Sequence, residues 1–186
     1  QEEDEMSLYK SSELLDTIGR EDPVYRDQCI KQWIIDGHRP DFLKMVPVES
    51  RANIGGQERV LTFYCFPDYI SFGNDQEFVI ANMSYDHAKE IAESMACTLP
   101  TRKMVDLIYR SSVKLNPQTM QWGVQMQSTA YMVQNTNLIE VQKRVRGIAN
   151  GTLIGGHKKD VVLSPRLEAM PGREAIYGWH QANGRP

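Results

Sequence analysis

The first clear periodic pattern in the chain lies between residues 22 and 37. Apolar side chains recur there at helical spacing: Tyr25, Cys29, Ile30, Trp33 and Ile34. Asp22 followed by Pro23 is typical of a helix start, because the carboxylate caps free amides and proline fits the first turn. Gly37 and Pro40 interrupt the pattern. We therefore predict a helix that begins at Pro23 and ends before Gly37.

The pattern changes after residue 58, where aromatic and β-favouring residues replace the helical spacing. Three short runs are separated by the turn residues Pro67-Asp68 and Gly73-Asn74-Asp75, and they cover residues 60–66, 69–72 and 78–81. Such runs, joined by tight turns, predict an antiparallel meander of three strands. The first run is apolar on both faces, which indicates a central position in the sheet.

Helical patterns return after residue 83. Ser84 and Thr101 are fitting N-caps for two helices, and Pro117 ends the second of them. A further helix is predicted over 138–148, and strands over 160–163 and 174–180. Because helices and strands do not alternate regularly, we predict an α+β fold with an antiparallel sheet of at least three strands and helices packed on one side. Residues 1–186 are predicted to form a single domain.

Two segments lack a clear period. Residues 1–21 form a polar lead-in, and residues 116–137 are rich in Gln and Asn. We interpret 116–137 as a long surface loop, which is where binding surfaces are often found. Four aromatic residues, two of them in 116–137 and two near the end of the chain, can stack on sugar rings or else belong to the core: Trp122, Tyr131, Tyr177 and Trp179.

Charge and composition narrow the class of protein. The net charge is −3, from 21 basic and 24 acidic residues, so no basic excess favours nucleic acid. No run approaches the roughly 20 apolar residues that span a membrane. The first residues are acidic and the chain does not begin with Met, which suits a mature chain after signal-peptide removal, or a trimmed one. We therefore expect a secreted or periplasmic protein.

The cysteines leave two interpretations open. Cys29, Cys65 and Cys97 are an odd number and too few for a disulfide scaffold. All three lie in apolar surroundings, so they are either buried thiols or one disulfide plus a free thiol, and the pair is not determined.

The strongest polar cluster in the sequence is His157, Asp160 and His180. Two imidazoles and a carboxylate can act as a general base that the carboxylate orients, or bind a catalytic zinc. A third interpretation makes them ordinary loop residues. The glycines at 151, 155 and 156 do not form a phosphate loop, because His157 stands where that motif has lysine.

The end of the chain resembles an unfinished hairpin. Residues 175–180 alternate as in a strand, and Asn183-Gly184 is a strong turn signal. We predict that 175–180 forms an edge strand, or pairs with another copy or a separate fragment. We also expect that the natural chain continues past Pro186.

Three motifs carry a resemblance to a known group. Residues 97–106 (CTLPTRKMVD), 156–162 (GHKKDVV) and 176–180 (IYGWH) stand in the order seen in a group of bacterial proteins, usually exported. This resemblance covers about residues 58–186 and brings no established activity, so it implies no catalytic residue. Residues 88–101 are also similar to the Leu-Pro-Thr segment of formylglycine-generating enzymes and their C-type-lectin-like relatives, which continue with acidic residues where this chain has Arg102 and Lys103.

Two function classes follow as hypotheses. The first is a secreted hydrolase that acts on a cell-envelope or extracellular polymer through His157, Asp160 and His180. The alternative is a non-catalytic module that binds glycan or another protein chain through the 116–137 segment and the nearby aromatic residues.

Overall fold

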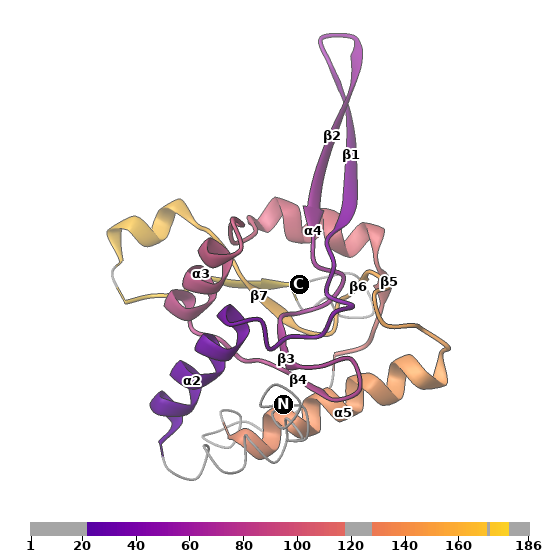
Figure 1. Cartoon of the computed structure of the whole chain (residues 1–186). Helices are drawn as coiled ribbons and strands as arrows, with labels where there is room; N and C mark the ends of the chain where they lie inside the picture. The colour runs from indigo at the N-terminus through magenta and orange to yellow at the C-terminus, as the bar shows by residue number, and fades with distance from the viewer. Residues whose placement is uncertain (1–21, 118–127, 171, 179–186) are drawn as a thin grey trace.

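The computed structural model describes residues 22–117, 128–170 and 172–178. In these ranges the chain has a mixed α+β structure, which confirms the predicted class (Figure 1). Its elements are α2 (Pro23–Ile35), β1 (Val46–Ile54), β2 (Gln57–Cys65), β3 (Ser71–Gly73), β4 (Phe78–Ile80), α3 (Tyr85–Ser94), α4 (Arg102–Ser111), β5 (Val113–Lys114), α5 (Thr129–Val145), β6 (Ile154–Gly155), β7 (Lys159–Val161), the 3-10 helix η3 (Pro165–Ala169) and β8 (Ile176–Gly178). None of the described helices combines the length and apolar character needed to cross a membrane.

The predicted helix starts are confirmed by their capping bonds. The Asp22 carboxylate accepts from the Val24 amide at 2.9 Å at the start of α2. Ser84 and Thr101 cap α3 and α4, each through a hydroxyl that accepts an amide at 3.3 Å. These signals were readable in the sequence because a cap and its amide lie two or three residues apart.

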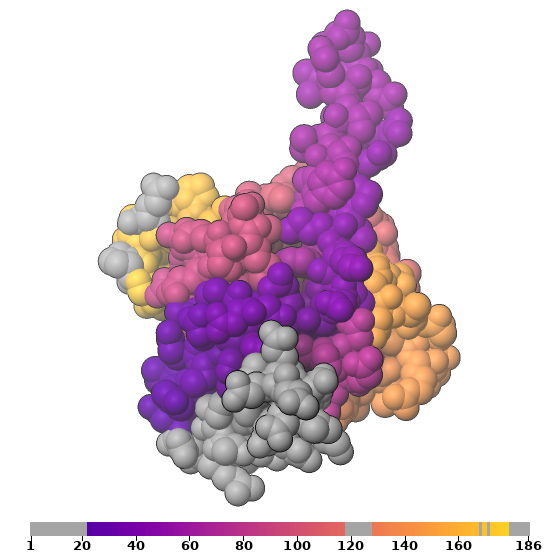
Figure 2. All heavy atoms as spheres, in the orientation of Figure 1, coloured from indigo at the N-terminus to yellow at the C-terminus, as the bar shows by residue number. Residues whose placement is uncertain are grey.

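A long hairpin, β1–β2, projects from the body of the molecule (Figures 1 and 2). Its antiparallel register runs from Val46 opposite Cys65 to Ile54 opposite Gln57. The turn residues Gly55 and Gly56 both have positive φ, as a tight two-residue turn requires. The central sheet position predicted for 60–66 is therefore wrong, because β1 is the one strand that pairs with β2 in the described ranges and Leu61 is 62% exposed.

The sheet of at least three strands is also wrong for the described residues, where every sheet has two strands. The pair β3–β4 shows why. The Ile80 amide of β4 donates to the Thr136 hydroxyl of α5 at 3.0 Å, and the Gly73 amide of β3 donates to the His38 carbonyl. A helix side chain and a loop carbonyl thus occupy the backbone amides at the sheet edges that would otherwise donate to a third strand. The pair β5–β6 is parallel instead of antiparallel.

The core lies on both faces of β3–β4. Side chains of neighbouring residues in a strand point to opposite faces, so Val79 joins one cluster while Phe78 and Ile80 join the other. The first cluster contains Ile30, Ile34, Phe72, Val79, Ala81, Ile91 and Met132. The second contains Phe78, Ile80, Leu115, Ile139 and Ile154. Three-residue strands therefore suffice, because one face is covered mainly by helices and the other mainly by loop residues and β6.

Helix α5 corrects the loop expected over 116–137. It begins at Thr129, capped by the Ser128 hydroxyl, so residues 129–137 are helical. Its buried stripe includes Thr129, Thr136 and Lys143 beside Met132 and Ile139. Polar residues in a buried stripe hide the apolar period that the prediction relied on. Residues 118–127 lie outside the described residues.

The prediction for the C-terminal strand is confirmed as far as the structure describes it. Strand β8 pairs antiparallel with β7, with Lys159 opposite Gly178 and Val161 opposite Ile176. Within the described part of the chain, β7 is its one partner strand, so β8 is an edge strand. Residues 179–180 lie outside that part.

Candidate functional site

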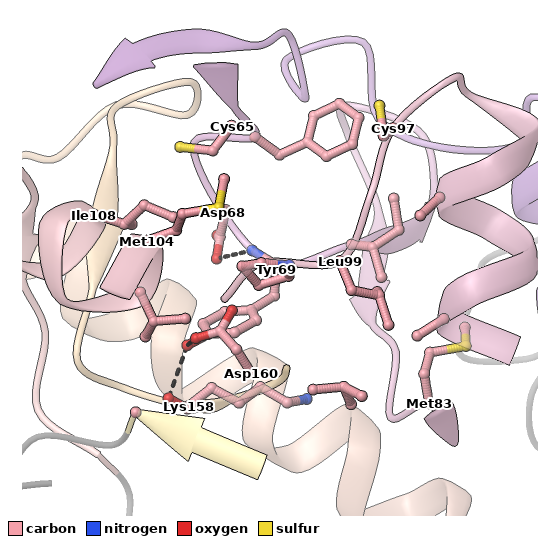
Figure 3. A pocket seen from close by; sticks show the side chains of 18 of the residues that line it. Cys65, Asp68, Tyr69, Met83, Cys97, Leu99, Met104, Ile108, Lys158 and Asp160 are labelled. Carbon is pink, nitrogen blue, oxygen red and sulfur yellow. Dashed lines mark hydrogen bonds between the residues drawn. The ribbon is translucent and has the colours of Figure 1, made fainter. Parts of the chain in front are cut away.

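A cavity of about 610 Å³ lies where β2, α3, α4, β7 and β8 meet (Figure 3). Most of its lining is apolar and includes Met45, Met83, Met95 and Met104. Methionine side chains adapt to irregular shapes, and this volume falls in the range of small-molecule pockets. The cavity is the strongest candidate for a functional site in the described residues.

Polar side chains from two distant segments converge in this cavity. The Tyr69 hydroxyl, just after β2, donates to the Lys158 carbonyl at 2.7 Å and lies 3.2 Å from Asp160 Oδ2 on β7. The Lys158 ammonium donates to Asn82 Oδ1 at 2.6 Å. Tyr69, Asn82, Lys158 and Asp160 all line the cavity.

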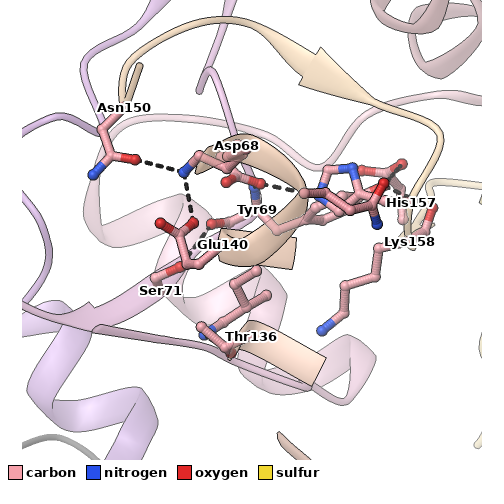
Figure 4. A network of polar contacts seen from close by, with 12 residues as sticks. Asp68, Tyr69, Ser71, Thr136, Glu140, Asn150, His157 and Lys158 are labelled. Carbon is pink, nitrogen blue, oxygen red and sulfur yellow. Dashed lines mark hydrogen bonds and ion pairs between the residues drawn. The ribbon is translucent and has the colours of Figure 1, made fainter. Parts of the chain in front are cut away.

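A buried pair adjoins this group. Asp68 Oδ1 accepts from the Tyr69 amide at 2.7 Å and lies 3.3 Å from His157 Nε2 (Figure 4). The side chains of Asp68 and His157 are 4% and 0% exposed. Asp68 Oδ2 and His157 Nδ1 have no hydrogen-bond partner among the described residues. Asp68 lines the cavity, whereas His157 lies behind it, with its ring edge-to-face against Tyr69.

Burial shifts the pKa values of two of these groups toward neutral pH. It raises the pKa of Asp160 to about 6, against the opposing effects of the Tyr69 hydrogen bond, His157 and Lys158. It lowers the pKa of Lys158 to about 8, against the opposing charges of Asp68 and Asp160. A carboxyl and an amine with such pKa values can exchange protons near pH 7.

The structure brings together two of the three predicted catalytic residues. His157 and Asp160 both contact Tyr69, through its ring and its hydroxyl respectively, but the Nε2 of His157 faces Asp68. His180 lies outside the described residues. Within the described ranges, no group of three or more His, Cys, Asp or Glu side chains gathers as metal ligands do, so the zinc hypothesis stays a prediction.

The predicted aromatic binding residues fall on separate elements. Tyr131 lies on α5 and Tyr177 on β8, and neither is among the described residues that line the cavity. The Tyr177 hydroxyl donates to Asp106 at 2.8 Å, and the Arg102 guanidinium lies over its ring at 4.7 Å from the centroid. The Tyr177 side chain therefore packs against residues of helix α4. Trp122 and Trp179 lie outside the described residues.

All three cysteines are free thiols, which answers the question left open by their number. Cys65 and Cys97 line the cavity. Burial, and then the nearby Asp160, raise the pKa of Cys65 to about 11. A thiol of that pKa is a poor nucleophile at neutral pH, so Cys65 contributes apolar lining.

Sequence reasoning missed Asp68 and Tyr69 because their partners lie about 90 residues further along the chain. The one local signal was an aspartate directly after Pro67 within an otherwise apolar stretch, which was interpreted as a turn residue. Comparison of the chain with protein-family models, curated proteins and solved structures finds no match.

Proposed function

We propose that this protein binds a small, largely apolar molecule in the cavity between α3, α4 and β7. The observation that carries the proposal is the cavity itself, with about 610 Å³ of mostly apolar space and a few convergent polar groups. Binding sites for small molecules combine those two features, since apolar walls supply affinity and the polar groups fix orientation.

A bulky side chain on the cavity wall tests this proposal. Ala92 of α3 lines the cavity, so Ala92→Trp is expected to weaken binding of a neutral fluorescent probe such as N-phenyl-1-naphthylamine by at least about tenfold. Ala130→Trp on the exposed side of α5 is the matched control and should bind as the native protein does. Equal binding by both variants, measured by fluorescence titration, would place the probe elsewhere and refute the proposal.

Hydrolysis is the second candidate function, favoured by the shifted pKa values of Asp160 and Lys158 at the cavity. In this scheme the Asp160 carboxylate takes a proton from the attacking water, and the Lys158 ammonium donates a proton to the leaving group. His157 would act through Asp68 as a positioning residue. The exported location and the extracellular polymer substrate stay predictions from the sequence.

The hydrolytic scheme predicts a bell-shaped pH profile for kcat/KM. Activity should rise as Asp160 ionises near pH 6 and fall as Lys158 loses its proton near pH 8. A panel of esters, amides and glycosides is the assay, with Asp160→Asn expected to lower the rate by about 100-fold or more. Asp36→Asn, an exposed change directly after α2, should leave the rate unaltered. A rate that survives Asp160→Asn would exclude the scheme.

A further inference from the structure

Resting on the proposed binding function, we propose that the ligand is an apolar amine, whose ammonium group is held between the carboxylates of Asp68 and Asp160. Both residues line the cavity, and the loop that follows β2 brings Asp68 to the same wall as β7 (Figure 3).

The main evidence is an unmet acceptor. Asp68 Oδ2 has no hydrogen-bond partner among the described residues. It is also shielded from water, since the Asp68 side chain is only 4% exposed. Leaving a buried carboxylate oxygen unpaired is costly, and a donor that reaches it recovers that cost. An ammonium offers three donors and a positive charge, which an alcohol does not.

The groups already present do not meet this need, because His157 Nε2 and the Tyr69 amide both lie against the other oxygen of Asp68, Oδ1. The Lys158 ammonium points toward Asn82 Oδ1 and the Ala81 carbonyl, at 2.6 and 3.5 Å. None of the ion pairs between described residues includes Lys158. The Tyr69 hydroxyl has a single proton, and its shorter bond is to the Lys158 carbonyl. Two carboxylates thus face the cavity with incomplete compensation.

The walls determine the rest of the ligand. Beyond the carboxylates, the lining is formed by side chains such as Met83, Met104 and Ile108, which suit an alkyl or aryl body. A fatty acid would fit the same walls, but its carboxylate would lie against Asp68 and Asp160. The head group, not the apolar body, therefore decides selectivity.

Isothermal titration calorimetry with decylamine, decanol and decanoate at pH 7 measures the three binding affinities and tests the inference. We expect decylamine to bind at least about tenfold more tightly than decanol, and decanoate most weakly. Asp68→Asn should weaken decylamine binding by about tenfold while leaving decanol binding unchanged. Lys158→Met removes a positive charge at the cavity that repels the ligand's ammonium, and it should therefore strengthen decylamine binding.

The outcomes separate this inference from the function on which it rests. Tightest binding of decanoate, with loss of that binding in Lys158→Met, would overturn the amine assignment and leave the apolar site standing. Binding of all three ligands that Ala92→Trp does not weaken would refute the site itself. If Asp68→Asn lacks the native circular dichroism spectrum, Asp160→Asn makes the same comparison, and unchanged decylamine affinity there overturns the inference.

Discussion

Replacing Phe72 with alanine is expected to lower the free energy of unfolding by about 3–5 kcal/mol. Phe72 of β3 is 2% exposed and belongs to the larger core cluster, with its ring 6.0 Å from that of Trp33 on α2. Truncation removes buried apolar surface and leaves a cavity that the surrounding helices cannot fill. Urea denaturation followed by circular dichroism measures the change.

Leu61→Ala is the control for this experiment. Leu61 also lies on a strand, but it is 62% exposed on the projecting hairpin, so its truncation should cost less than about 0.5 kcal/mol. A cost for Leu61→Ala close to that for Phe72→Ala would mean that another surface covers the hairpin, and the distinction between core and arm would fail.

The second large effect is expected at Gly156, which follows β6. Its φ is +91°, and a Cβ there would lie 2.9 Å from Cε2 of Tyr109 and 3.2 Å from the Leu115 carbonyl oxygen. Gly156→Ala therefore combines left-handed strain with overpacking, for a loss of about 2–5 kcal/mol in unfolding free energy. Because Gly156 lines the cavity and precedes His157, the variant should also weaken ligand binding.

Gly37→Ala separates the two causes. Gly37 has a similar φ of +99°, but a Cβ there meets no atom within 4 Å. This variant should lose only the strain, about 1–2 kcal/mol. If both glycine variants lose the same free energy of unfolding, the close approach of Tyr109 to Gly156 contributes nothing.

Local signals determined the elements that the sequence analysis located well. The starts of α2, α3 and α4 were predicted because Asp22, Ser84 and Thr101 cap amides within their own first turn. The β1–β2 hairpin was open to the same kind of reasoning, since Gly55-Gly56 is a two-residue turn signal, but its first strand was overlooked.

Tertiary packing decided the features that the periodic pattern misjudged. Thr136 of α5 is buried because its hydroxyl accepts a hydrogen bond from the Ile80 amide of β4. The same hydrogen bond occupies the amide that a third strand would need, so β3–β4 stays a pair. Strand β2 is apolar yet exposed because it lies on a projecting arm. An apolar run indicates that burial is favourable, but not whether the fold supplies a surface to cover it.

Some residues of the candidate site were likewise identifiable from the sequence, and others only from the tertiary structure. The sequence by itself singled out His157 and Asp160, since polar side chains beside Gly155-Gly156 are conspicuous. Only the tertiary structure placed Asp68 and Tyr69 beside them, buried His157 behind the cavity, and shifted the pKa values of Asp160 and Lys158 through burial. Capping and turn formation act between neighbours in the chain, whereas desolvation depends on everything that folds around a group.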